Sequence, residues 1–79
     1  MRLDKYLKVS RLIKRRTVAN EACDKERVSA NGRTVKASYD VKIGDIIEIR
    51  FGQRTLKIEV LSVSEHATKA DAVTMYKEV

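Results

Sequence analysis

The first sixteen residues hold seven of the chain's 17 lysines and arginines but only one acidic residue, Asp4. The seven cations are Arg2, Lys5, Lys8, Arg11, Lys14, Arg15 and Arg16. Acids and bases balance over the rest of the chain, so this segment carries the whole net charge of +6. A surface built only for solubility mixes both signs. Cations concentrated on one segment attract a polyanion and donate hydrogen bonds to phosphate oxygens.

Side chains able to perform catalysis or ligate a cofactor are few. The sequence has no Gly-rich phosphate loop, nucleophile motif or cluster of metal ligands, and we therefore expect no catalytic residue, no metal and no cofactor. His66, the only histidine, follows the last long predicted strand and is interpreted as a surface residue. Cys23 is interpreted as a small buried hydrophobe. Asp4 is interpreted as a helix-stabilising residue, favoured by the helix dipole and by an i,i+4 pair with Lys8.

Length and composition limit the architecture. The chain has 79 residues, of which 43% are apolar and 35% charged, which predicts one domain over residues 1–79. No apolar run exceeds two residues, which excludes a transmembrane helix or a secretory signal in this sequence. One cysteine cannot form an internal disulfide. We therefore expect a cytoplasmic protein that is not bound to a membrane.

Two short helices are expected to position the cations. Leu3, Tyr6 and Leu7 at helical spacing predict a first helix that begins at the chain's N-terminus. Thr17 is the predicted N-cap of a second helix, which ends near Lys25. The small apolar residues of the second helix would allow the two helices to pack closely.

The remainder of the chain is expected to form a small antiparallel sheet. Asn31-Gly32 between two β-prone segments predicts a hairpin, and residues 41–45 are interpreted as a strand that enters a turn. Alternating apolar residues predict a longer hairpin, with Ile47, Ile49 and Phe51 on one strand and Leu56, Ile58, Val60 and Val63 on the other. Residues 68–76 carry Ala70, Val73 and Tyr76 at helical spacing and predict a terminal helical segment. The order of these elements is typical of an α+β fold.

Arg2 and Arg16 are expected at the starts of the two helices, where the helix dipole disfavours a cation. Local stability therefore does not explain them. A phosphate does, because the free N–H groups of a helix start and an arginine together bind an anion. We expect these two arginines to contribute more to binding than the other five cations.

The cations favour folded or double-helical RNA as the polyanion, although charge alone does not exclude DNA. The chain has four aromatic rings, and most are expected in the core, so stacking on single-stranded bases is not the leading mode. A-form RNA presents phosphates and 2′-hydroxyls more readily than base edges, which suits recognition by backbone and shape.

Four blocks of residues carry a resemblance to a known family. They are Arg2-Leu3-Asp4-x-x-Leu7, Lys14-Arg15-Arg16-Thr17-x-Ala19, Val28-x-Ala30-Asn31-Gly32 and Val41-x-x-Gly44-Asp45. Together they resemble the S4 RNA-binding domain, with its core motif at about residues 2–50. Because the chain is little longer than that motif, it resembles the stand-alone heat-shock-protein-15-like branch. The first seventeen residues and the turn at 50–53 are similar to the bacterial ribosome quality-control members of that branch.

The resemblance implies a fold and a binding surface. The fold is two short N-terminal helices packed on a small twisted antiparallel sheet, with a short C-terminal helical segment. The surface is the helical face, with contacts to RNA from Arg2, Lys8, Arg11, Lys14, Arg15 and Arg16, and from Asn31 and Lys36 on the hairpin. The charge of the first segment adds Lys5 to this set. One position departs from the family, because Glu26 stands where a glycine usually closes the second helix.

The resemblance also implies a function without catalysis. It implies binding to large-subunit rRNA and peptidyl-tRNA on a stalled large ribosomal subunit, beside the factor that adds a C-terminal tail to the nascent chain. We expect a ribosome-associated monomer. Two alternatives stay open: a general S4-domain binder of other structured RNA or precursor rRNA, and an adaptor whose sheet binds a protein. Salt dependence separates them, because RNA docking through the cations weakens steeply with salt.

Overall fold

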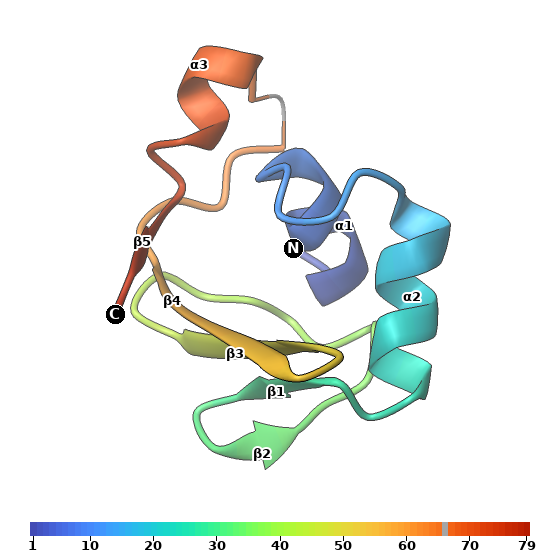
Figure 1. Ribbon diagram of the computed structural model, residues 1–79. Helices are drawn as coiled ribbons and strands as arrows, with labels where there is room; N and C mark the ends of the chain where they lie inside the picture. Colours follow the sequence, from blue (N-terminus) through green and yellow to red (C-terminus); the bar gives the residue numbers. More distant parts are fainter. Residues whose placement is uncertain (66) are drawn as a thin grey trace.

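The computed structural model describes residues 1–65 and 67–79, so the surface position expected for His66 lies outside the described residues. The elements in chain order are α1 (Leu3–Val9), α2 (Arg16–Asp24), β1 (Val28–Ala30), β2 (Arg33–Thr34), β3 (Ile46–Phe51), β4 (Arg54–Val60), α3 (Lys69–Ala72) and β5 (Tyr76–Glu78). The strands form one antiparallel sheet in the order β2-β1-β3-β4-β5. Helices α1 and α2 lie on one face of this sheet, with α3 near the end of β4 (Figure 1). The predicted α+β fold is confirmed.

The core lies between the sheet and α1. Ile47 and Ile49 of β3 are fully buried, as are Ile58 and Val60 of β4, which confirms the alternation expected for these strands. Helix α1 contributes Leu3, Tyr6 and Leu7 to the same cluster. Burial of these apolar side chains is the main term that holds α1 on the sheet.

Small side chains on α2 form its contact with the core. Ala19 is fully buried and Cys23 is 3% exposed, so the interpretation of Cys23 as a buried hydrophobe is confirmed. Burial, with smaller contributions from Asp4 and Asp24, raises the pKa of the Cys23 thiol to about 11. The thiol is therefore protonated at neutral pH and is a poor nucleophile.

The first hairpin turns at the predicted residues. Asn31 has φ 53° and Gly32 has φ 84°, the two positive values that a type I′ turn requires. The side chain of Asn31 also ties this turn to β3. Its Oδ1 accepts from the Ile46 N–H at 3.0 Å, and its Nδ2 donates to Asp45 Oδ1 at 3.1 Å.

Residues 41–45 are not a strand, contrary to the sequence prediction. Val41 is buried, and the chain turns at residues 43–44. Asp45 holds this turn, because its Oδ2 accepts from the Lys42 N–H at 3.0 Å and from the Tyr39 hydroxyl at 2.8 Å. Burial alone would raise the pKa of Asp45, but the hydrogen bonds from Lys42, Asn31 and Tyr39 lower it below its ordinary value.

The C-terminal segment is helical over a shorter range than predicted. Helix α3 ends at Ala72, and Tyr76 begins β5, which pairs with β4 through Val60↔Tyr76. Val73, expected on the helix's apolar side, is 69% exposed, whereas Met75 is buried and its carbonyl accepts from the Tyr6 hydroxyl at 2.8 Å. Pairing with the free edge of β4 therefore determines the conformation at Tyr76, although the spacing of residues 70–76 is helical. Strand β4 itself ends before Val63.

Helix α2 begins one residue before the predicted N-cap. Arg15 is the N-cap, with extended backbone, and Thr17 lies inside the first turn. No side chain caps this helix start, and the Arg16 side chain instead pairs with Asp4 of α1. The helix ends at the predicted place, with Lys25 as its C-cap.

Glu26 adopts a left-handed backbone conformation, which favours glycine. Its φ is 58°, its N–H donates to Cys23 O, and the Arg27 N–H donates to Ala22 O. These two bonds form a Schellman motif, which closes α2. A side chain in this left-handed conformation costs about 1 kcal/mol relative to glycine.

Candidate nucleic-acid interface

The seven N-terminal cations lie on α1, on the loop that follows it, and on the first turn of α2. We call them the basic surface: Arg2, Lys5, Lys8, Arg11, Lys14, Arg15 and Arg16. All are exposed except Lys5, which is half-buried and whose Nζ lies 3.2 Å from Glu65 Oε1. Five of them form two groups: Lys8, Arg11 and Lys14 line an open groove, and Arg2 and Arg16 surround a buried carboxylate.

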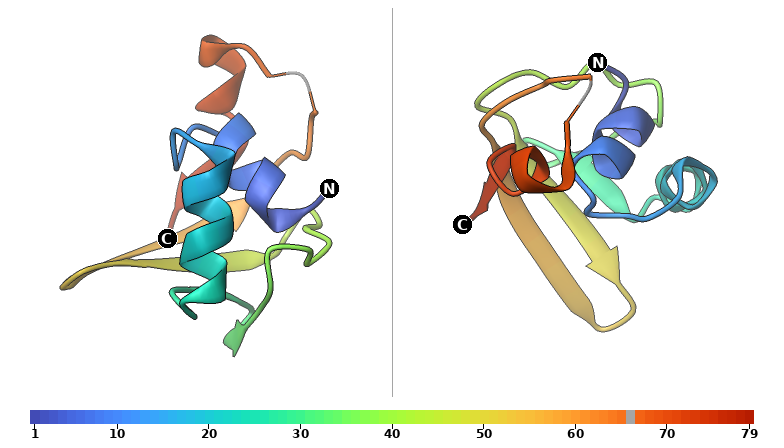
Figure 2. Two further views of the ribbon diagram at one scale, coloured as in Figure 1. Left: turned by 90° about the vertical axis from the view of Figure 1, so that its right-hand side faces the viewer. Right: turned by 90° about the horizontal axis from the view of Figure 1, so that it is seen from above.

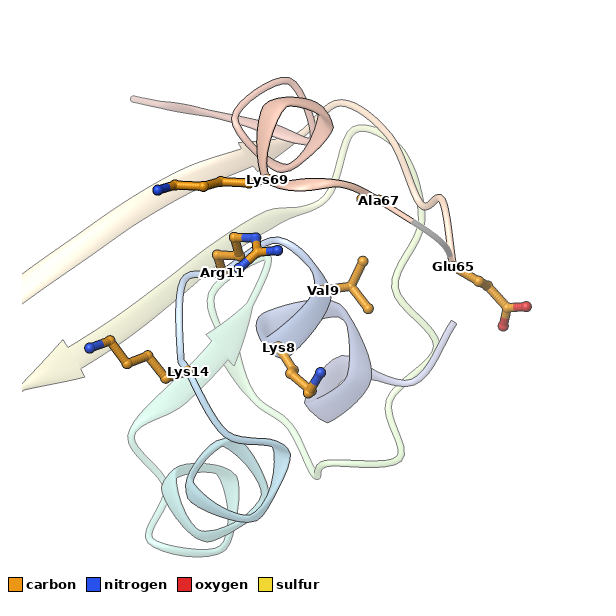
Figure 3. Close-up of a pocket in the computed structure, with 7 residues that line it drawn as sticks. All are labelled: Lys8, Val9, Arg11, Lys14, Glu65, Ala67 and Lys69. Carbon is orange, nitrogen blue, oxygen red and sulfur yellow. The ribbon is translucent and has the colours of Figure 1, made fainter.

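The groove has a volume of about 560 Å³ and lies between α1 and the segment that leads into α3. Its lining residues are Lys8, Val9, Arg11, Lys14, Glu65, Ala67 and Lys69. Figure 3 shows the four cations around it, contributed by α1, by the following loop and by α3. The groove thus brings together three predicted site residues and adds Lys69.

Lys69 was missed in the sequence prediction. It is the first residue of α3, immediately after the capping-box residue Thr68. A cation in the first turn of a helix opposes the helix dipole. This unfavourable position is the sequence feature that could have identified Lys69 as a binding residue.

Arg11 reaches the groove from a strained backbone. Its φ is 62°, and its N–H donates to Lys8 O at 3.0 Å, which closes the end of α1. Glycine would adopt this conformation at lower cost. A cationic side chain in this conformation at the edge of a groove makes Arg11 a candidate functional residue.

The second group surrounds Asp4, whose side chain is 4% exposed. Arg2 donates from Nε to Oδ1 at 3.2 Å and from Nη2 to Oδ2 at 3.4 Å. Arg16 approaches the same carboxylate, with Nε 3.4 Å from Oδ2 and Nη2 3.5 Å from Oδ1. Asn20 Nδ2 donates to Oδ2 at 3.3 Å, and the Lys5 N–H donates to Oδ1 at 2.8 Å. We call this arrangement the Asp4 clamp.

The clamp corrects two expectations. Asp4 binds Arg2 and Arg16 rather than Lys8, so its expected i,i+4 pair is not formed. The two arginines, in turn, compensate a buried charge, so local stability does explain part of their presence. Burial would raise the pKa of Asp4, but the hydrogen bonds from Arg2, Asn20 and Arg16 hold it below its ordinary value.

The arginines of the clamp retain exposed surface for a ligand. The Arg2 side chain is 51% exposed and that of Arg16 is 46% exposed, whereas the carboxylate between them is not accessible. Each guanidinium has five N–H donors, of which Arg2 uses two and Arg16 uses one in hydrogen bonds to Asp4. The clamp therefore fixes both guanidinium groups and leaves donors available for an anion.

The starts of the two helices differ. At α1, the Leu3 N–H donates to Tyr39 O at 2.8 Å and the Asp4 N–H donates to Ala37 O at 3.2 Å. The backbone donors expected to be free at the start of α1 are therefore occupied, and the contact of Arg2 with RNA stays a prediction. At α2, no acceptor among the described residues takes the N–H groups of Thr17 and Val18. The start of α2 is open to an anion.

The two hairpin residues of the predicted site are separated by the structure. Lys36 is exposed and precedes Ala37, whose carbonyl contacts the start of α1, so it lies beside the clamp. Asn31 uses both ends of its amide on Asp45 and Ile46, away from the basic surface. Its predicted contact with RNA stays a prediction, and its observed role is to hold the turn.

The outer face of the sheet mixes both signs of charge. Glu48 lies opposite Lys57 in the β3–β4 register, and Lys77 Nζ lies 3.8 Å from Glu59 Oε1. Such a face does not attract a polyanion. Over residues 1–65 and 67–79, no group of three His, Cys, Asp or Glu side chains is placed to hold a metal ion. No helix in these ranges is long and apolar enough to cross a membrane.

Comparison with known proteins agrees with this geometry. The S4 domain family matches residues 1–47. Proteins named RQC P-site tRNA stabilizing factor from Streptococcus pneumoniae and Bacillus subtilis are 54% and 53% identical, over 98% and 96% of this chain and 88% of each relative. The trimeric structure of Vibrio cholerae heat shock protein 15 has a TM-score of 0.92 and 32% identity, over 100% of this chain and 81% of that one. The chain belongs to the S4 domain family.

Proposed function

We propose that this protein binds the large ribosomal subunit in the quality control of stalled translation, where it contacts rRNA and peptidyl-tRNA. The names of its relatives support a role with P-site tRNA in that process. In this proposal the protein supports the addition of a C-terminal tail to the stalled chain, beside the factor that performs the addition. It is located in the cytoplasm, on the ribosome.

The observation that carries the proposal is the arrangement of the basic surface around the open start of α2. The N–H groups of Thr17 and Val18 are available there, and Arg15 and Arg16 flank them. Backbone donors and guanidinium groups together bind a phosphate better than either does alone. Lys8, Arg11 and Lys14 line the neighbouring groove, which gives the next phosphates of an RNA backbone their partners.

The proposed role is binding rather than catalysis. A carboxylate that accepts several hydrogen bonds from cations, as Asp4 does, is held ionised and is a weak general base. The Cys23 thiol is buried and has a raised pKa. In the proposal, the protein acts by positioning RNA, and the chemistry of tailing belongs to other components of the particle.

Sedimentation of a bacterial extract tests the proposal. We expect the protein with free large subunits that carry peptidyl-tRNA, and more of it when translation is stalled. A triple variant with Lys8, Lys14 and Arg15 changed to Gln should leave this fraction. The matched triple variant with Lys42, Lys57 and Lys77 changed to Gln has the same net charge and should remain in it.

Two other distributions would contradict the proposal. Sedimentation with precursor particles alone would favour a general binder of structured RNA. Equal retention of both triple variants would favour an adaptor that binds through its sheet.

We further propose that the protein acts as a monomer. The heat shock protein 15 relative has been described in a trimeric structure, so the question needs a direct measurement. Light scattering of the free protein should give the mass of one chain, 9.0 kDa. A mass three times larger would contradict this.

A further inference from the structure

The tip of the β3–β4 hairpin carries an aromatic ring that the core does not use. Phe51 is 43% exposed, although it has the same strand parity as Ile47 and Ile49, which are fully buried. Figure 2 shows the cause, because the hairpin extends beyond the part of the sheet that the helices cover. The side of the tip that faces the helices is therefore open, and Phe51 lies on that side.

A cation shares the face of this ring. Arg54 lies directly opposite Phe51 in the β3–β4 register, so the two side chains share one face of the hairpin. Beside the tip is a second open groove of about 240 Å³, lined by Lys25, Arg27, Arg50 and Gly52. Arg50 has the opposite strand parity to Phe51, so it projects from the other face of the hairpin, and Lys25 Nζ lies 3.0 Å from Glu21 Oε1.

The groove is fixed by the backbone. Arg50 donates from its N–H to Arg27 O at 2.8 Å and from Nη2 to Glu26 O at 3.1 Å. These two bonds tie the hairpin to the end of α2. The tip is therefore held at a defined distance from the basic surface, because the nine residues of α2 separate them by about 14 Å.

We infer that the hairpin tip is a second RNA site, which binds one unpaired nucleotide. The base stacks on the exposed face of Phe51, and Arg54 contacts an adjoining phosphate. An exposed ring beside a cation is an arrangement that binds single-stranded nucleic acid. This inference goes beyond the proposed function, because a fully paired RNA would satisfy the basic surface.

The turn geometry leaves the ring accessible. Gly52 has φ 59° as the first residue of a two-residue turn, which is typical of type II′. A Cβ built at Gly52 would meet nothing within 4 Å, so the space beside the ring is open. Arg54 favours an RNA ligand over an apolar pocket of a protein, since burial of this exposed cation in such a pocket would be unfavourable.

Binding of matched RNA hairpins tests the inference. One set has a fully paired stem, and the other carries a single unpaired adenosine at successive positions along the same stem. We expect the wild type to bind the best bulged RNA about tenfold more tightly than the paired RNA, which corresponds to about 1.4 kcal/mol. Phe51→Leu should abolish this preference, and Phe51→Tyr should keep it.

The controls separate this site from the basic surface. Val73→Ala removes apolar surface from another exposed position and should keep the preference. The Lys8, Lys14 and Arg15 triple variant should bind both RNAs more weakly by the same factor. If the proposed function fails, the wild type binds neither RNA, whereas if only this inference fails, the wild type binds both RNAs equally well. The thermal midpoint of Phe51→Leu should stay within about 3 °C of the wild type.

Several results would overturn the inference. One is a Phe51→Leu variant that retains the preference for bulged RNA. Another is a Phe51→Tyr variant that loses the preference while it keeps its fold. Release of a protein partner from the ribosomal particle by Phe51→Leu, with the RNA preference unchanged, would show that the ring binds protein instead.

Discussion

The two helices of the basic surface begin in different ways, although each has an arginine at its start. The first N–H groups of α1 are bound by the carbonyls of Tyr39 and Ala37, so this start is closed by the rest of the fold. The first N–H groups of α2 have no such acceptor among the described residues. The start of α1 therefore holds the protein together, and the start of α2 is free to bind a phosphate.

Asp4 connects the two starts. It lies in the first turn of α1, yet it binds Arg16 of α2 as well as Arg2. The buried carboxylate of Asp4 thus fixes the positions of both arginines, although only Arg16 has free backbone N–H groups beside it. The difference teaches that charge alone does not define a binding site, because backbone donors must also be available.

The largest effect on stability is expected from Asp4→Asn. The change removes a charged acceptor from Arg2, Arg16 and Asn20, and should lower the free energy of unfolding by about 2 kcal/mol. Denaturant titration measures this. The control is Asp40→Asn, which removes an exposed ion pair with the N-terminus and should leave the midpoint nearly unchanged. Equal effects of the two changes would show that the clamp has no special role.

Arg16→Ala and Arg2→Ala compare the two starts directly. Arg16 lies beside free N–H groups, so its loss should weaken binding to structured RNA by about 1.5 kcal/mol. The loss of Arg2 should cost about half as much, because the donors at its helix are occupied. Lys5→Ala is the control, since Lys5 already pairs with Glu65.

Binding measured at one salt concentration decides this ranking. Equal losses for all three changes would mean that the surface acts as diffuse charge. Both arginine variants should also melt earlier, because each leaves Asp4 with one cation fewer. The argument from the sequence, that local stability does not explain these two arginines, is thus replaced.

Acid should destabilise the folded protein when Asp4, at the start of α1, becomes protonated. The pKa of Asp4 is lower in the folded protein than its ordinary value of 3.8, so its ionisation stabilises the fold above that value. This contribution is lost as the pH falls below about 4, toward the folded pKa. Thermal midpoints between neutral pH and about pH 2.5 should fall less steeply for Asp4→Asn than for the wild type. Parallel curves would contradict the ionised clamp.

The smallest effect is expected from the helix ends. Glu26→Gly relieves a left-handed conformation away from the basic surface, so it should stabilise the fold by about 0.7 kcal/mol without a change in affinity for paired RNA. Arg11→Gly relieves the same strain but removes a groove cation, so it should weaken binding by about 0.5 kcal/mol. Melting curves and RNA titrations of both variants test this. A stabilised Arg11→Gly with full affinity would exclude Arg11 from the site.

Short sequence patterns predicted the elements that a few neighbouring residues specify. The Asn31-Gly32 turn needs two positive φ values, which these residue types accept, and α1 follows from three apolar residues at helical spacing. Contacts between distant segments were not readable from the sequence. The occupied start of α1 depends on the loop at residues 37–39, and β5 depends on the free edge of β4.

The candidate site follows the same division. The sequence located the cations, because their clustering is a local property. It did not reveal that Asp4 pairs with Arg16, twelve residues away, or that Lys69 joins the groove. Phe51 continues the alternation of Ile47 and Ile49, which are buried. It is exposed because the helices do not cover the end of the β3–β4 hairpin.

The central claim is that RNA binds through the cations around the open start of α2, and its salt dependence tests this most directly. If about six cations contact phosphates, the slope of log K against log salt should be about −4 to −5 for structured RNA. The Lys8, Lys14 and Arg15 triple variant should be shallower by about 2 to 3, and the Lys42, Lys57 and Lys77 variant should keep the slope of the wild type. A wild-type slope shallower than about −1, or equal slopes in the two triple variants, would contradict the claim.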